Sequence, residues 1–179
     1  MYPVYLPSKK VVLREFRQDD AEAAFHVVGD SRVTDWLSFD ARSHEQATDM
    51  VAGIVARAQD QPRTEYYLAI TTHESDSLIG FVRLGLSGVQ AAKLGFAITA
   101  DAWGHGYATD AARTLTTFAF RSLDLHRVSA AIGPTIRVSM LLVTKLGFVP
   151  EGRIRDHVFT NGAWRDSVLY SVLNDEWSG

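Results

Sequence analysis

Apolar and polar residues along this chain follow two rhythms, one typical of strands and one typical of helices. Stretches rich in Val, Ile, Leu, Tyr and Phe predict strands at residues 11–16, 65–72, 77–86, 91–99, 127–132, 153–160 and 163–173. Apolar residues that recur every three or four positions predict helices at residues 21–28, 47–58, 108–119 and 136–146. Strands and helices are therefore interspersed along the whole chain.

Local signals set the expected boundaries of these elements. Asp19 with Glu22 and Ser43 with Gln46 have the spacing of capping boxes at the starts of the first two helices. Gly147 is a stop signal for the last helix. The strongest hairpin signal is Asn161-Gly162, between the last two strands. Residues 31–42 and 73–76 are predicted to be loops.

The order of elements predicts an α/β (α+β) fold. Three consecutive strands favour an antiparallel meander, and the passage strand–glycine loop–helix–strand favours one parallel crossing. We expect a mixed, mostly antiparallel sheet of seven strands with about four flanking helices. Residues 1–179 contain no repeat or linker and are expected to form a single domain.

Composition excludes several classes of protein. A net charge of −3 gives no footprint for nucleic acid. No apolar run approaches the roughly 20 residues that a membrane span needs, and the first residues lack the pattern of a secretory signal. A cytoplasmic location is therefore expected. The chain has no cysteine, which rules out disulfides, thiolate metal sites and an acyl-cysteine intermediate.

The stretch 103–109, Trp-Gly-His-Gly-Tyr-Ala-Thr, joins a predicted strand to a predicted helix. Glycines allow close approach of the backbone, and the start of a helix attracts anions, so the arrangement favours phosphate binding. No Lys or Arg occurs within it. The Walker pattern is absent, and the dinucleotide pattern fails at Thr109, which disfavours an oxidoreductase. A turn that merely starts a helix is the plain alternative.

The neighbouring motifs resemble those of the GNAT superfamily of acyl-CoA-dependent N-acyltransferases, in its RimJ/RimL-like branch. The motifs that carry the resemblance are 92–98 (Ala-Lys-Leu-Gly-Phe-Ala-Ile), 102–112, Ser139, 145–152 (Lys-Leu-Gly-Phe-Val-Pro-Glu-Gly) and 161–177. The resemblance implies a GNAT fold in which strands 91–99 and 127–132 splay apart. It also implies acetyl-CoA as co-substrate, with no metal.

The resemblance assigns residues to the cofactor. The pyrophosphate would lie on the loop formed by Trp103, Gly104, His105, Gly106, Tyr107, Ala108 and Thr109. The backbone of Phe96, Ala97 and Ile98 would pair with the pantetheine arm as an added strand does. Trp103 either packs against the cofactor or fills a cleft, and His105 is expected to be a solvated loop residue. Ser139 would contact the sulfur or relay a proton; the alternative is a helix-face serine with no ligand.

Three positions depart from the family pattern. Lys93 stands where many relatives carry a glutamate base, Val143 where they carry a tyrosine acid, and Ile136 where they carry an asparagine. Candidates for a base or for contacts with the acceptor are Asp35, Asp40, Asp156 and His157, although each, taken singly, is better explained as a solvated or structural residue. Trp36 and Phe39 either line the acceptor groove or belong to the core.

The expected activity is direct transfer of an acetyl group from acetyl-CoA to a primary amine. A protein or peptide N-terminus, or a small-molecule amine such as an antibiotic or an amino acid, tolerates a weak base because an α-amine has a pKa of about 8, against about 10.4 for lysine. A non-catalytic module that binds or senses acyl-CoA is the alternative. Nucleic acid and membrane are not expected as partners, and the chain is expected to be a monomer or a homodimer.

Overall fold

The computed structural model describes residues 1–179 and contains one eight-stranded sheet in the order β1-β2-β3-β4-β5-β6-β8-β7. The strands are β1 Tyr5–Pro7, β2 Val11–Glu15, β3 Glu65–Thr72, β4 Gly80–Leu86, β5 Ala91–Ile98, β6 Arg127–Ile132, β7 Val149–Thr160 and β8 Ala163–Leu173. The α-helices are α1 Ala21–Val28, α2 Ser31–Thr34, α3 His44–Arg57, α4 Tyr107–Arg121 and α5 Arg137–Lys145. Short 3-10 turns are η1 Gln18–Asp20, η2 Ala100–Ala102 and η3 Asn174–Glu176.

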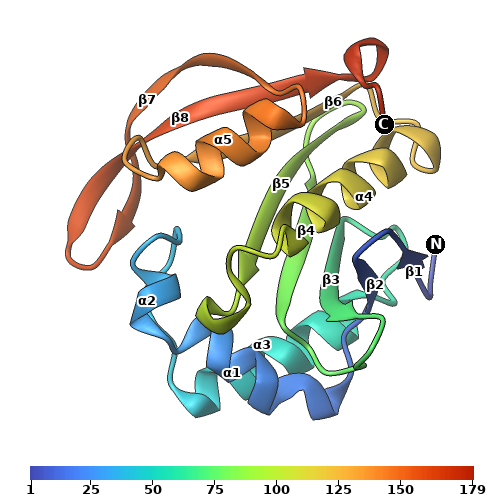
Figure 1. Ribbon diagram of the computed structural model, residues 1–179, viewed down its shortest axis with the longest axis vertical. Coiled ribbons are helices and arrows are strands. Elements are labelled where there is room, and N and C mark those ends of the chain that lie inside the picture. The colour runs from blue at the N-terminus through green and yellow to red at the C-terminus, as the bar shows by residue number, and fades with distance from the viewer.

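Helices cover both faces of the sheet (Figure 1), and the two hydrophobic cores that they form differ in size. One face carries α4 and α5, whose buried residues share a core of 28 residues with strands β2 to β6 and β8. The other face carries α1 and α3, which form a core of 12 residues with β3, β4 and β5. Along β5, alternate residues therefore point to different cores: Leu94 and Ile98 face α4, and Ala97 faces α1 and α3.

The predicted mixed and mostly antiparallel sheet is confirmed, but its strand number is wrong by one. The additional strand β1 has three residues, lies at the sheet edge beside β2 and ends in Pro7, so it has too few positions to show an alternating pattern. Residues 31–42 were predicted to be a loop, yet they begin with the one-turn helix α2. Strand β7 starts at Val149 rather than at residue 153.

The two predicted capping boxes have different outcomes. Ser43 and Gln46 form theirs at the start of α3. The Asp19 prediction is wrong, because α1 begins after Asp20 and no side chain caps it. The Asp20 carboxylate instead accepts hydrogen bonds from the buried Arg14 guanidinium and from the Arg17 backbone N–H. The predicted Asn161-Gly162 hairpin is confirmed, with φ of 51° and 71°, as a type I′ turn requires.

Strands β5 and β6 are parallel neighbours for a short distance only. Ala91, Ala92 and Lys93 pair with residues 127–129, and the register ends there although β5 continues to Ile98. Beyond Lys93 the two strands diverge, with α4 and α5 on the same face of the sheet at the divergence (Figure 1). This is the predicted splay. None of the helices combines the length and the apolar character that a membrane span requires.

Candidate active site

The glycine loop lies between η2 and the start of α4. Gly104 and Gly106 have φ of +82° and +79°, a conformation that other residues adopt only under strain. Gly106 is the residue that precedes the helix, and no side chain caps the helix there. The first N–H groups of α4 are therefore left without a side-chain acceptor, and the helix dipole places positive charge at the same point. This is the backbone arrangement that favours an anion.

A lysine distant in sequence lies beside this loop. Lys10 Nζ donates a hydrogen bond of 2.7 Å to the His105 carbonyl. Its position is fixed by Asp110 in the first turn of α4, whose Oδ2 accepts from the Lys10 N–H at 2.7 Å and from Ser8 Oγ at 2.5 Å. The loop itself has no cation, but the β1–β2 connection brings one to it. Sequence reasoning missed Lys10 because no local pattern links residues about a hundred positions apart.

The aromatic residues of the loop are held by polar contacts. Trp103 is half-exposed, and its Nε1 donates a 2.9 Å hydrogen bond to the Ile98 carbonyl at the end of β5. His105 is exposed, as expected; its Nδ1 contacts the Trp103 carbonyl at 2.9 Å, and its ring stacks on Tyr107 with centroids 5.4 Å apart. These contacts hold the loop in place through its own side chains. They leave the N-terminus of α4 open.

The divergence leaves backbone groups of β5 without a partner strand. Ser87 N–H bonds the Ala91 carbonyl and Thr99 N–H bonds the Ile79 carbonyl, so odd-numbered residues of β5 direct their backbone groups to β4. Beyond the pairing with β6, the Leu94 C=O, both groups of Phe96 and the Ile98 N–H consequently face the gap, whereas the Ile98 C=O accepts from Trp103 Nε1. Ala97, predicted with Phe96 and Ile98, turns its groups to β4 instead.

The start of α5 flanks the gap on the same side as α4. Its preceding residue, Ile136, provides no side-chain cap, so the N–H groups of Val138 and Ser139 are open, while that of Arg137 donates to the Thr135 carbonyl. Ser139 is the third residue of this helix and is partly buried. Val143, one turn later, is fully buried in the main core. Arg137 in the same turn is exposed, so the Ser139 hydroxyl is the partly buried polar group there, and Val143 offers no hydroxyl in place of the tyrosine of many relatives.

The opposite face of the divergence carries Lys93. Lys93, Ser129 and Ser171 are successive cross-strand partners on β5, β6 and β8, so they share one face. Lys93 is exposed, and Ser171 Oγ donates a 2.6 Å hydrogen bond to Glu151. Arg127 also binds the Glu151 carboxylate, and these contacts lower the pKa of Glu151 to about 2. This carboxylate is therefore too weak a base to replace the missing glutamate.

The proposed acceptor residues come from two segments that meet at the β7–β8 hairpin. Asp40 Oδ1 accepts from the Asn161 N–H at 2.7 Å, and the Asp35 carbonyl accepts from Arg165 at 2.9 Å. The segment that follows α2 is thus tied to the hairpin. Trp36 is 51% exposed, whereas Phe39 is partly buried against the smaller core.

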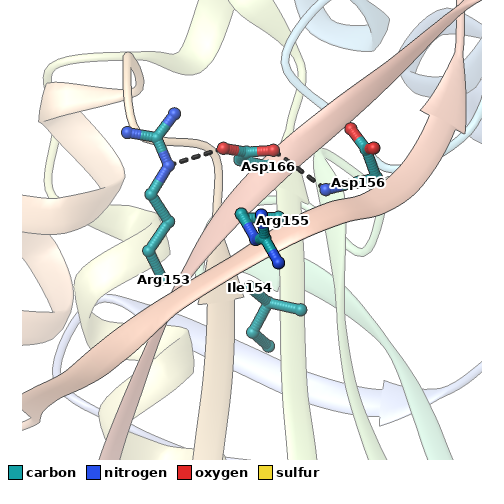
Figure 2. Close-up of a pocket in the computed structure, with 5 residues that line it drawn as sticks. All are labelled: Arg153, Ile154, Arg155, Asp156 and Asp166. Atoms are coloured by element: carbon teal, nitrogen blue, oxygen red, sulfur yellow. Dashed lines mark hydrogen bonds and ion pairs between the residues drawn. The ribbon is translucent and has the colours of Figure 1, made fainter.

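A bulge in β7 lies close to these contacts in the hairpin. Ile154 pairs with Ser167 and Val158 with Arg165, so three residues of β7 oppose one of β8. Figure 2 shows the polar hollow that results, about 650 Å³ in volume, where Asp166 binds the Arg153 guanidinium and the Asp156 N–H. The charges of Arg153 and Asp166 are matched within the hollow.

His157 has a single side-chain partner in the same bulge. Its Nδ1 lies 2.9 Å from Ser167 Oγ, and Ser167 is buried. Its ring is therefore held by a hydroxyl rather than by a carboxylate. The structure brings together no three His, Asp or Glu side chains able to hold a metal ion.

Comparison with known proteins assigns this chain to a family. Residues 10–149 match the acetyltransferase (GNAT) domain. The chain is 28% identical over 175 residues to the uncharacterized N-acetyltransferase YoaA of Bacillus subtilis (strain 168), over 97% of this chain and 98% of that protein. It is 27% identical over 116 residues to the ribosomal protein uS5-alanine N-acetyltransferase of Escherichia coli (strain K12), over 63% of this chain and 60% of that protein.

Solved structures agree with this comparison at the level of the fold. Mycobacterium smegmatis RimJ in complex with CoA-disulfide aligns with a TM-score of 0.87 at 21% identity, over 99% of this chain and 91% of that one. The splayed strands, the glycine loop and the matched domain point to the same conclusion. The chain belongs to the GNAT family and is an N-acetyltransferase that uses acetyl-CoA.

Proposed function

We propose that this enzyme transfers an acetyl group from acetyl-CoA directly to a primary α-amine, either a protein N-terminus or a small molecule. The observation that carries the proposal is the set of backbone groups without a protein partner at the divergence, on the start of α4 and along the edge of β5 that faces the gap. The open N-terminus of α4 suits the pyrophosphate, and the gap-facing N–H groups of Phe96 and Ile98 suit the pantetheine arm and the thioester carbonyl.

The residues of the chain divide the chemistry as follows. Backbone N–H groups at the gap stabilise the negative charge that develops on the carbonyl oxygen. Ser139 at the open start of α5 donates a hydrogen bond to the departing sulfur. Because a thiol has a pKa of about 8.5, the thiolate leaves without a strong acid, and the proton lost by the attacking nitrogen passes to water or to the departing thiolate. The chain contains no cysteine to carry an acyl group, so the amine attacks the donor itself.

The choice of an α-amine follows from the lack of a base. Lys93 occupies the base position, and Glu151 has a pKa near 2. At neutral pH roughly a tenth of α-amines are uncharged, against on the order of one in a thousand lysine side chains. An α-amine therefore reacts without a carboxylate beside it. The uS5-alanine N-acetyltransferase of E. coli is named for an acceptor of this kind, and a cytoplasmic location would suit such an acceptor.

The test is a screen for release of free CoA with N-terminal peptides, amino acids, aminoglycosides and polyamines. We expect turnover with α-amines and much slower turnover with N-α-blocked lysine. The kcat/KM profile should rise with pH up to the pKa of each amine and shift when the amine is changed. A melting temperature raised by acetyl-CoA, with no CoA release from any amine, would support the non-catalytic binding module instead.

Direct transfer has its own test. Mass spectrometry of the enzyme mixed with acetyl-CoA alone should show the unmodified chain mass. A stoichiometric acetyl adduct that an amine removes would contradict direct attack and point to a serine or lysine carrier.

A further inference from the structure

The acceptor face of the sheet, opposite α4 and α5, carries positively charged side chains on β4 and β5. Arg83 on β4 pairs with Tyr67 on β3 and with Gly95 on β5. Lys93 lies two residues from Gly95, so its side chain leaves the same face. The Arg83 guanidinium extends over Gly85, the cross-strand partner of Lys93, because a Cβ built on Gly85 would lie 3.2 Å from Arg83 Nη2.

Arg42 joins these residues from the segment that precedes α3. Its guanidinium lies over the Phe39 ring, 5.0 Å from the centroid. Arg42 and Arg83 are both close enough to the Tyr67 phenol to lower its pKa, although burial outweighs them and raises it. Arg42, Arg83 and Lys93 are called the cationic cluster below.

The acidic groups around the cationic cluster are already engaged elsewhere: Glu151, which lies on the same face as Lys93, is paired with Arg127. Glu65 accepts from Arg57 Nε at 2.8 Å through one carboxylate oxygen and from Arg83 Nε at 2.9 Å through the other. One carboxylate thus serves two arginines. Asp40 and Asp35, on the segment before Arg42, are held at the β7–β8 hairpin by Asn161 and Arg165. Neither Arg42 nor Lys93 takes part in an ion pair of the structure.

Arg42 also has an unmet hydrogen-bonding requirement. Its Nε is fully buried and has no hydrogen-bond partner. An outside anion cannot reach this buried Nε, but the Nη groups of Arg42 are not buried and make no hydrogen bond to the protein, so they remain as donors for one. The Phe39 ring beneath the guanidinium holds it in place.

We propose that the cationic cluster binds a carboxylate of the acceptor, so that the acceptor is an amine that bears a nearby carboxylate. The inference rests on the proposed function, because Lys93 stands where relatives carry the base and so faces the reacting amine. A free amino acid and a peptide with an acidic second residue both present this chemistry. Arg42 and Lys93 contact the carboxylate, and Arg83 is shared with Glu65.

The test compares acceptors that differ in one charge. The first pair is Ala-Glu-amide and Ala-Gln-amide, and the second is alanine and alaninamide, with rates expressed per neutral amine. Charge-assisted contacts favour the charged member of at least one pair by about tenfold or more in kcat/KM. The preferred pair identifies the source of the carboxylate, side chain or main chain. The preference should also decrease as salt is added.

Variants then assign the preference to residues. Arg42→Gln and Lys93→Gln should each remove most of the preference through KM for the charged acceptor, and Arg42→Lys should retain part of it. The matched control is Arg121→Gln, at the exposed end of α4, which should leave the preference unchanged. Thermal melting of each variant shows that the fold is retained.

The outcomes separate the two proposals. Brisk turnover of all four acceptors with less than twofold preference would overturn the inference and leave the proposed function standing. Absence of CoA release from every amine would overturn the proposed function. Calorimetry with the product N-acetyl-Ala-Glu-amide, against its Gln counterpart, then decides the inference separately: tighter binding of the Glu product, lost in Arg42→Gln, supports it, and equal binding refutes it.

Discussion

The two faces of the sheet at the β5–β6 divergence differ in the groups they offer. On the donor face, α4 and α5 both begin without a side-chain cap, and β5 presents unpaired N–H groups. On the acceptor side, α2 and α3 are capped by Asp30 and Ser43, and the sheet presents charged side chains. One face is built from backbone and the other from side chains.

This difference indicates which part of the candidate site tolerates changes of side chain and which part does not. A site of backbone N–H groups requires a conformation rather than particular side chains, so Trp103 can begin the glycine loop without removing a donor. A site of side chains changes its preference with each substitution, as Lys93 in the base position illustrates. We therefore expect binding of the donor to follow from the fold and choice of the acceptor to follow from this sequence.

The largest expected effect comes from blocking the backbone site. Gly106→Val adds a side chain at φ +79°, where a Cβ lies 3.1 Å from Lys10 Nζ. We expect acetyl-CoA affinity, measured by calorimetry, to fall by about a hundredfold or more, because several charge-assisted hydrogen bonds are lost together. Gly88→Val is the control, with φ +68° and open space around it. Unchanged affinity in a folded Gly106→Val protein would remove this loop from the site.

Ser139→Ala tests the side chain that the donor face does contribute. Loss of the hydroxyl should lower kcat by about 10- to 100-fold, at or below the usual range for a general acid, and leave KM for acetyl-CoA almost unchanged. Thr144→Ala, on the exposed side of the same helix, is the control because its hydroxyl bonds the Met140 carbonyl. An equal loss in both variants would indicate damage to α5 rather than a role for Ser139.

Lys10→Gln should have a smaller effect, because Lys10 is exposed and water screens its charge. Acetyl-CoA affinity is expected to fall by about three- to tenfold at low salt, with a weaker dependence on added NaCl. Lys9→Gln serves as the neighbouring control. Identical salt dependence in the two variants would show that the backbone alone recognises the phosphates.

The smallest expected effect is on stability in acid. The Arg127 and Ser171 contacts lower the pKa of Glu151 to about 2 from 4.5, so the stability they give is present above about pH 4.5 and is lost as the pH falls toward 2. Glu151→Gln should therefore make Tm depend less on pH in this range. The corresponding change in the free energy of unfolding is expected to be about 1 kcal/mol or less, because the pair is exposed. Parallel melting curves at pH 5 and 3 would contradict this.

The sequence predicted the elements that have clear periodicity, and its errors have physical causes. The strand β1 has three residues, and α2 is a single turn, so neither repeats a pattern. Asp19 was predicted to cap the first helix, but the helix begins after Asp20, whose contact with the buried Arg14 forms only once β2 and η1 come together.

The candidate site could be outlined from the sequence where it depends on local backbone, and could not where it depends on distant contacts. The glycine loop follows from consecutive residues. Which β5 residues face the gap depends on register with β4, and this excludes Ala97. Lys10 and Arg42 reach their places through Asp110 and Phe39, and no spacing rule connects such residues.

The attachment of Asp110 to Ser8 and Lys10 has a consequence for folding kinetics. These contacts join residues 102 and 100 positions apart, and closing such long loops slows folding relative to local contacts. During synthesis, β1 and β2 leave the ribosome long before α4 exists, and β6 gains its partner β8 last. The glycine loop therefore reaches its final form among the late steps of folding. A newly made chain should acquire CoA binding only when nearly all of its length has folded.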